Sequence, residues 1–139
     1  MSLLQPADWA RPQGYAHGIV STGRLVFVSG QIGCDAAGRF AASDIARQTR
    51  QALSNIVAIL AEAGALPEHV TRLSWFVTDK NGYLEARGAI GAAYREVMGR
   101  HFPAMSVVVV AGLLESAACV EIEATAVIPP ACADASIER

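Results

Sequence analysis

Positive charge is scarce and scattered in this 139-residue chain. Lys80 is the single lysine among 11 lysines and arginines, and the arginines form no cluster anywhere in the sequence. A protein that neutralises several phosphates needs clustered lysine and arginine. Because the chain has no such cluster and its net charge is −2, we expect it to have no nucleic-acid partner.

Long apolar runs, a secretion signal and paired cysteines are missing too. No apolar run reaches the roughly 18 residues that a membrane-spanning helix needs. Residues 1–10 lack the basic cluster and apolar stretch of a secretory signal. The three cysteines, Cys34, Cys119 and Cys132, are odd in number and widely spaced, which argues against a disulfide framework. We therefore expect a cytoplasmic protein without membrane contact.

Generic catalytic and metal-binding motifs are absent as well. The sequence has no P-loop, no G-x-G-x-x-G after a strand, no H-E-x-x-H, no C-x-x-C and no G-x-S-x-G. His17, His69 and His101 are too far apart to have metal-ligand spacing. We therefore expect no metal site.

Apolar residues, in contrast, are abundant. They make up 53% of the chain, against 17% for charged residues. So small a domain cannot hide this much apolar surface by itself, and a subunit interface is the simplest place for the excess. Since repeats, low-complexity tracts and linkers are missing, the sequence predicts one domain over residues 1–139, with a loose tail at 129–139.

Hydrophobic periodicity predicts two helices and five strands. The first helix is capped by Ser43 or Asp44 and ended by Gly64, and the second spans about 83–100. A hairpin turn at 22–23 joins the first two strands. The strands are expected at 17–21, 24–29, 69–78, 106–111 and 119–128, after an irregular lead-in at 1–16.

The order β-β-α-β-α-β-β indicates an α/β (α+β) fold in which two helices cover one face of a mixed sheet. The other face then needs a second subunit. The valines at 107–110 also indicate a second subunit, because such a run is typical of a strand buried on both faces. Gly88 and Gly91 predict that the second helix lies close on the sheet. The sequence therefore favours a homo-oligomer with small-molecule sites between its subunits.

Three segments could carry chemistry. Glu121 and Glu123 are two residues apart on the last strand, so both carboxylates leave one face of the sheet, with Cys119 beside them. They either mark the solvated side of that strand or place a carboxylate in a cleft, where it can hold a water or move a proton. The glycines of S-G-Q-I-G, 29–33, either form an ordinary strand exit or let backbone groups touch a ligand. H-F-P-A-M-S, 101–106, leads into the valine strand.

These segments and two others make the chain resemble a known family. They are G-Y-A-H (14–17), F-V-S-G-Q-I-G (27–33), V-T-D (77–79), F-P-A-M-S (102–106) and V-E-I-E-A-T-A-V (120–127). So arranged, the chain is similar to the Rid family, the reactive intermediate deaminases also called RidA or YjgF proteins. The resemblance covers about residues 9–128, which would be the core of the domain.

The resemblance implies a chorismate-mutase-like fold, a homotrimer and three clefts between neighbouring subunits. RidA members hydrolyse 2-imino or 2-enamino acids, such as 2-aminoacrylate, to a 2-keto acid and ammonia without a metal or an organic cofactor. By the same resemblance Glu121 is the catalytic residue that places the attacking water. Tyr15 lines the cleft, the backbone of Gly30 touches the ligand or water, and Gln31 and Ser106 belong to the substrate site.

The chain also departs from the family pattern. Met105 stands where RidA proteins have an arginine that grips the substrate carboxylate, and His17, Gly91 and Val107 replace a frequent glutamine, asparagine and cysteine. A bidentate charged hydrogen bond contributes about 1.5–3 kcal/mol, so its loss predicts poor activity on free 2-imino acids. His17 or His101 could supply a substitute donor, since histidine is partly protonated near neutrality.

Two functions follow from this mixture. The first is hydrolysis or tautomerisation of a small imine, enamine or related carbonyl compound, less anionic or larger and more apolar than 2-aminoacrylate. The retained residues Tyr15, Gly30 and Glu121 favour it. The second is a binding module whose clefts hold a metabolite unchanged, which the replacement at Met105 favours. The endoribonuclease label that the family has carried is disfavoured by the scattered positive charge.

Overall fold

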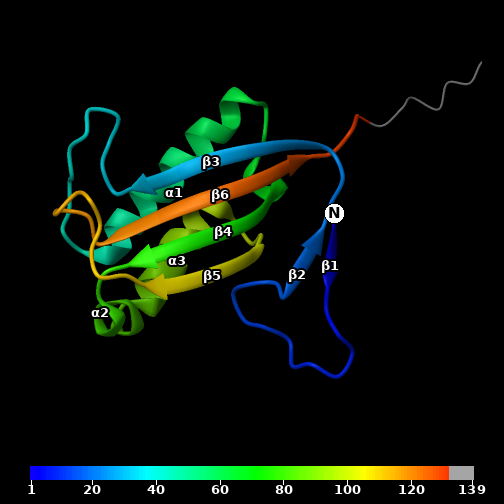
Figure 1. Ribbon diagram of the computed structural model, residues 1–139, viewed down its shortest axis with the longest axis horizontal. Helices are drawn as coiled ribbons and strands as arrows, with labels where there is room; N and C mark the ends of the chain where they lie inside the picture. Colours follow the sequence, from blue (N-terminus) through cyan, green and yellow to red (C-terminus); the bar gives the residue numbers. More distant parts are fainter. Residues whose placement is uncertain (132–139) are drawn as a thin grey trace, which may run out of the picture.

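The computed structural model describes residues 1–131 and places a four-stranded sheet at the centre of the chain (Figure 1). The strands lie in the order β3, β6, β4, β5. They span Arg24–Ile32 (β3), Val70–Val77 (β4), Ala104–Val109 (β5) and Val120–Ile128 (β6). β6 is antiparallel to both of its neighbours and β4 is parallel to β5, so the sheet is mixed, as the sequence predicts.

Helices cover one face of this sheet (Figure 1). The longest is α1 (Ile45–Glu62), and Asp44 caps it by accepting a hydrogen bond from the backbone N–H of Arg47. Gly64, at φ +72°, follows its end in the left-handed region that favours glycine. This helix and both of its ends were predicted from the sequence.

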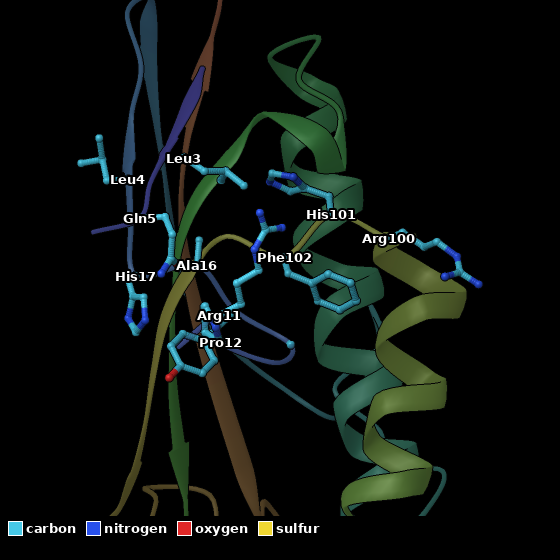
Figure 2. A pocket seen from close by; sticks show the side chains of 12 residues that line it. Leu3, Leu4, Gln5, Arg11, Pro12, Ala16, His17, Arg100, His101 and Phe102 are labelled. Atoms are coloured by element: carbon cyan, nitrogen blue, oxygen red, sulfur yellow. The ribbon is translucent and has the colours of Figure 1, made fainter. Parts of the chain in front are cut away.

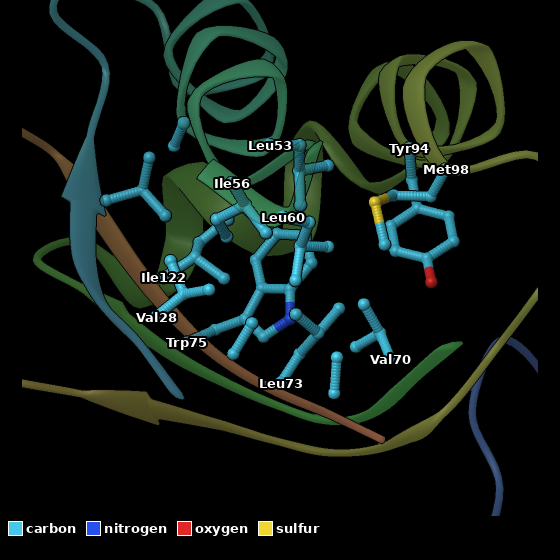
Figure 3. Packing of buried hydrophobic residues seen from close by; sticks show 14 of the residues in the cluster. Val28, Leu53, Ile56, Leu60, Val70, Leu73, Trp75, Tyr94, Met98 and Ile122 are labelled. Carbon is cyan, nitrogen blue, oxygen red and sulfur yellow. The ribbon is translucent and has the colours of Figure 1, made fainter. Parts of the chain in front are cut away.

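The core lies between the helices and the inner face of the sheet (Figure 3). Leu53, Ile56 and Leu60 of α1 are fully buried there, against Leu73 and Trp75 of β4. Each such apolar side chain contributes about 1.5–3 kcal/mol when it is fully buried. The alternating pattern predicts Leu73, Trp75 and Val77 on one side of β4. Their burial confirms this prediction.

The predicted helix at 83–100 is two helices in the structure, α2 (Lys80–Glu85) and α3 (Arg87–Met98). They meet at Ala86, where ψ is 5° and no glycine or proline marks the break. The prediction that Gly88 and Gly91 let this helix approach the sheet is wrong. A Cβ atom on Gly88 would meet nothing within 4 Å, and one on Gly91 would meet only the side chain of Arg95.

The N-terminal segment differs most from the prediction. β2 (Gly18–Val20) does not form a hairpin with β3, because it pairs antiparallel with β1 (Ser2–Leu4) in a separate two-stranded sheet. Part of the lead-in is thus a strand. The segment is tied to the main sheet by a parallel bridge between Ala16 and Ala104 of β5. A three-residue strand has too few alternating positions for the sequence to fix its partner.

The valine strand β5 lies at an edge of the sheet, so the prediction that it is covered on both faces is wrong for the single chain. Val107, Val108 and Val109 are 37%, 45% and 53% exposed. On the face opposite the helices, Leu25 and Phe27 of β3 are 61% and 74% exposed. Coverage of these apolar side chains by a second subunit stays a prediction.

The predicted loose tail at 129–139 lies mostly outside the described residues, which end at Ala131. Pro129 and Pro130 follow the last strand and are exposed. In the described part of the chain, every helix is too short or too polar to cross a membrane.

Candidate functional site

Glu121 and Gly30 form a close contact where β3 and β6 lie side by side. A Cβ atom on Gly30 would lie 2.0 Å from Glu121 Oε1, so only glycine leaves room for this carboxylate. Val120 and Ile122 are fully buried under the helices, and therefore Glu121 and Glu123 point to the opposite, open face of the sheet. The shared face of the two carboxylates was predicted. We call the contact between Glu121 and Gly30 the carboxylate corner.

A β-bulge adjoins the carboxylate corner. Val28 pairs with Ala124 and Gln31 pairs with Ile122, so β3 has one residue more than β6 between these pairs. Such a bulge takes backbone groups out of the regular ladder, here those near Gly30. The side chain of Gln31 bends back over it, because Nε2 donates to the backbone oxygen of residue 29 at 3.2 Å. The bulge thus places irregular backbone beside the carboxylate of Glu121.

A cavity of about 590 Å³ lies on the other side of the sheet, between β5, α3 and the lead-in. We call it the β5–α3 cavity. Two of the residues predicted for the substrate site, Tyr15 and Met105, line it, and so do Gly91 and Val107. The other residues that line it are Gln13, Gly14, Trp75, Tyr83, Leu84, Arg87, Ile90, Tyr94, Arg95 and Phe102.

Aromatic rings form one wall of the β5–α3 cavity. Trp75 and Tyr94 are stacked with ring centroids 6.4 Å apart, and Tyr94 and Phe102 are stacked at 5.3 Å. The Tyr94 hydroxyl donates to the backbone oxygen of His101, which fixes the ring between its two neighbours. Such a wall favours a planar or apolar group on the ligand.

The carboxylate corner and the β5–α3 cavity lie on opposite faces of the sheet. Met105 pairs with the buried Leu73 and so faces the helices. Glu121 pairs with Phe76, which alternates with buried residues and so faces the open side. Within one chain, therefore, Glu121 and Met105 cannot both contact one small molecule.

Ser106, like Glu121 and Gly30, is a residue of the predicted site that lies on the open face of the sheet. It is exposed and pairs with Ser74, which in turn pairs with Glu123 of β6. Two interstrand spacings, about 10 Å, separate Ser106 from β6, so it does not reach the carboxylate corner of its own chain.

The two histidines considered as substitutes for the missing arginine do not line the β5–α3 cavity. Both line a second cavity of about 460 Å³, between the N-terminal strands and the loop before β5 (Figure 2). His101 Nε2 lies 2.6 Å from the Val70 backbone oxygen, and His17 Nε2 lies 3.3 Å from that of Ala10. Tyr15 stacks edge-on against His17 and lines both cavities.

Three groups near these sites have a raised pKa, and burial is the main cause for each. It raises the pKa of the Cys119 thiol, whose sulfur lies 3.1 Å from Gln48 Oε1. This cysteine packs against Gln48 of α1 and is disfavoured as a nucleophile. Burial also raises the pKa of Tyr94, and that of Tyr83, where Arg87 partly offsets it. In residues 1–131 no group of three or more His, Cys, Asp or Glu side chains could hold a metal ion.

Two cavity residues carry charge and were not predicted from the sequence. Arg87 and Arg95 lie on α3, four residues to either side of Gly91. Their spacing was visible in the sequence, but the scattered arginines gave no reason to single them out. Their position around Gly91 could have identified them, because Gly91 aligns with an asparagine of the family pattern and so already indicated this helix.

Comparison with known proteins gives a family for this arrangement. The family described as Endoribonuclease L-PSP matches residues 9–128, most of the chain. The chain belongs to this family, the Rid family. A Rid family protein of unknown function from Yersinia pestis, YyfB, has a structure with a TM-score of 0.81 at 28% identity, over 91% of this chain and 98% of that one.

Two relatives connect the Rid family to small molecules. The 2-iminobutanoate/2-iminopropanoate deaminase of Salmonella typhimurium is 36% identical over 111 residues, which cover 78% of this chain and 83% of that protein. The structure of Escherichia coli TdcF with bound serine has a TM-score of 0.65 at 32% identity, over 92% and 99% of the two chains. The chorismate-mutase-like α+β fold expected of a Rid protein is thereby confirmed.

Proposed function

We propose that this Rid protein hydrolyses a small imine or enamine, with Glu121 as the catalytic residue. The observation that carries the proposal is the carboxylate corner, where Glu121 lies against Gly30 and beside the β-bulge of β3. A carboxylate next to backbone donors and acceptors can hold a water in a fixed direction. The naming of relatives at 33–36% identity as imine deaminases supports the same reaction.

The reaction is a hydrolysis in which no electron is gained or lost. Glu121 accepts a proton from the water as its oxygen bonds to the imine carbon, and the electron pair of the C=N double bond moves to nitrogen. The proton then passes from Glu121 to that nitrogen. The hydroxyl group of the resulting carbinolamine then gives its proton to the nitrogen through the carboxylate of Glu121. The carbon–nitrogen bond breaks as the C=O double bond forms, ammonia leaves, and a carbonyl product remains with the carboxylate of Glu121 restored. An enamine enters the same sequence after protonation at carbon.

The proposal places the site between two chains of a homotrimer. Because Glu121 and Met105 lie on opposite faces of one sheet, a single site needs the carboxylate corner of one chain and the β5–α3 cavity of another. The exposed Phe27 and Val108, on the same open face as Glu121, support a contact between chains there. Tyr15, Gly30, Gln31 and Met105 would then bind the substrate, whereas Ser106 points away from the cavity of its own chain and does not reach the corner of that chain.

The substrate is proposed to be larger and more apolar than 2-aminoacrylate. Met105 offers a thioether where the family pattern has arginine, and aromatic rings line the same cavity. Neither His17 nor His101 lines this cavity, so the proposal gives them no part in binding the substrate there.

The test is Glu121→Gln, with Glu123→Gln as a matched control on the same strand and face. Imines are generated from leucine or phenylalanine by an amino-acid oxidase with catalase, and 2-aminoacrylate by a serine-dehydrating enzyme. We expect wild type to speed release of ammonia and 2-keto acid, Glu121→Gln to lose about 10²–10⁴-fold, and Glu123→Gln to keep its rate. Equal rates for wild type and Glu121→Gln would remove Glu121 from the mechanism.

A second candidate function is a binding module that holds a metabolite without changing it. Met105 and Gly91 favour it, because both stand where the family pattern has polar side chains. Under this function no imine would be hydrolysed faster with wild type than with Glu121→Gln. A 2-keto or amino acid would nevertheless raise the melting temperature of the protein and be recovered unchanged.

A further inference from the structure

We propose that Arg87 and Arg95 bind the carboxylate of the substrate in the β5–α3 cavity, and that this substrate carries a bulky apolar or aromatic side chain. The inference rests on the proposed function, because it names the substrate class of that same site. For substrates with such side chains, it replaces the expectation that the loss of arginine at Met105 makes activity on free 2-imino acids poor.

The charges around the β5–α3 cavity are all positive. Arg87 and Arg95 line it, and no aspartate or glutamate does so in the described part of the chain. The three ion pairs within residues 1–131 use Arg39, Arg47 and Arg50 instead. Neither cavity arginine is thus neutralised by a described carboxylate. Two uncompensated guanidinium groups beside an apolar wall attract an anion, and the planar group pairs well with a carboxylate.

The helix brings the two arginines to one side. Arg87, Gly91 and Arg95 are four residues apart in turn and so lie along one face of α3. A Cβ atom on Gly91 would be 3.2 Å from Arg95 Nη1, which shows that this guanidinium lies over the glycine. Arg87 Nε donates to the Leu84 backbone oxygen at 3.1 Å, which orients that side chain. The absence of a side chain at Gly91 thus lets Arg95 lie along the cavity.

The apolar wall determines the other half of the substrate. Trp75, Tyr94 and Phe102 stack in a row, and Met105 and Ile90 extend the apolar lining. The methylene group of 2-aminoacrylate would leave most of a cavity of about 590 Å³ unfilled. A phenyl or branched side chain would fill it, with its carboxylate toward α3. We therefore assign 2-imino acids with aromatic or branched side chains as the substrate class.

Calorimetric binding of phenylpyruvate, the keto acid that such a reaction would release, tests the inference directly. Pyruvate lacks the aromatic ring, and methyl phenylpyruvate lacks the charge. We expect both to bind at least about tenfold more weakly than phenylpyruvate, since a charged hydrogen bond or a buried ring each contributes at least about 1.4 kcal/mol.

Substitution of the arginines gives the matching result in the protein. Arg87→Gln/Arg95→Gln is expected to weaken phenylpyruvate binding at least about tenfold, with little change for the methyl ester. Arg95→Lys, which keeps the charge but loses the planar fork, should lie between wild type and Arg95→Gln. Arg47→Gln is the control, because Arg47 lies on α1 and pairs with Asp44 outside the cavity. Circular dichroism checks that each variant is folded.

Each outcome bears on the inference separately from the proposed reaction. Unchanged phenylpyruvate binding in the folded double variant, or equal binding of the methyl ester by wild type, overturns the inference even if imines are hydrolysed. Loss of phenylpyruvate binding in the double variant supports it even if Glu121→Gln shows that nothing is hydrolysed. In that second case the arginine assignment stands and the hydrolase proposal fails.

Discussion

The carboxylate corner and the β5–α3 cavity follow the Rid pattern to different degrees. The corner keeps both pattern residues, Glu121 and Gly30, in direct contact. The cavity keeps Tyr15, but it has Met105 and Gly91 where the pattern has arginine and asparagine. In our account the corner performs the chemistry and the cavity selects the substrate. The proposed function therefore retains the reaction class and changes the substrate.

The packing of the two regions explains why one can vary more than the other. The corner has no room for a side chain at Gly30, because a Cβ atom there would overlap the carboxylate of Glu121. The cavity is lined by side chains from α3, β5 and the lead-in, several of which are partly exposed. A substitution in the cavity would change the fit of a ligand without moving the sheet, whereas a side chain at Gly30 would displace the carboxylate of Glu121.

Gly30→Ala should have the larger effect of the two changes that sharpen this comparison. The added Cβ would lie 2.0 Å from Glu121 Oε1, so the carboxylate must move. A displacement of about 1 Å costs about 10²-fold in rate, and we expect at least that loss in imine hydrolysis. Gly88→Ala is the control, because its Cβ meets nothing within 4 Å. Wild-type turnover by Gly30→Ala would show that the corner tolerates change as the cavity does.

Met105→Arg should have a smaller effect and in the opposite direction. Met105 lines the cavity on β5, so a guanidinium there gives a small imino acid a bidentate contact on the side of the cavity opposite Arg87 and Arg95 of α3. We expect KM for 2-aminoacrylate to fall about tenfold, with a smaller effect on the phenylalanine-derived imine. Met105→Gln has similar length without charge and should leave KM unchanged. The same fall in KM with glutamine would show that charge at this position does not select the substrate.

The elements that the sequence predicts best are those whose pattern is local. α1 follows from its 3.6-residue period and from Asp44 at its start, and the shared face of Glu121 and Glu123 follows from alternation on one strand. The contact of Gly30 with Glu121 joins two distant segments. The resemblance to the family implied that both residues belong to one site, but their contact was not predicted, because nothing local in either segment indicates the other.

The features that were missed depend on tertiary packing. The break between α2 and α3 lies at Ala86, which is neither glycine nor proline. The pairing of β2 with β1 involves only three residues of each strand, which is too short a pattern to identify the partner from the sequence. The exposure of the valines reflects the edge position of β5, which residue type does not reveal. Arg87 and Arg95 could not be predicted as site residues, because they become neighbours of the site only through the cavity that α3 and β5 enclose together.

Mixed trimers test the central claim, that one site combines the corner of one chain with the cavity of another. Glu121→Gln disables the corner, and Gly91→Phe fills the cavity at a position where a Cβ meets only the end of the Arg95 side chain. The two variants are co-expressed with different tags and purified through both. Each variant alone should be inactive in imine hydrolysis.

Every mixed trimer of these variants contains one junction where an intact corner meets an intact cavity. The account therefore predicts about one third of wild-type turnover per trimer. If the site lies within one chain, each chain carries one defect and no junction can restore it. Turnover no higher than that of the separate variants would contradict the account.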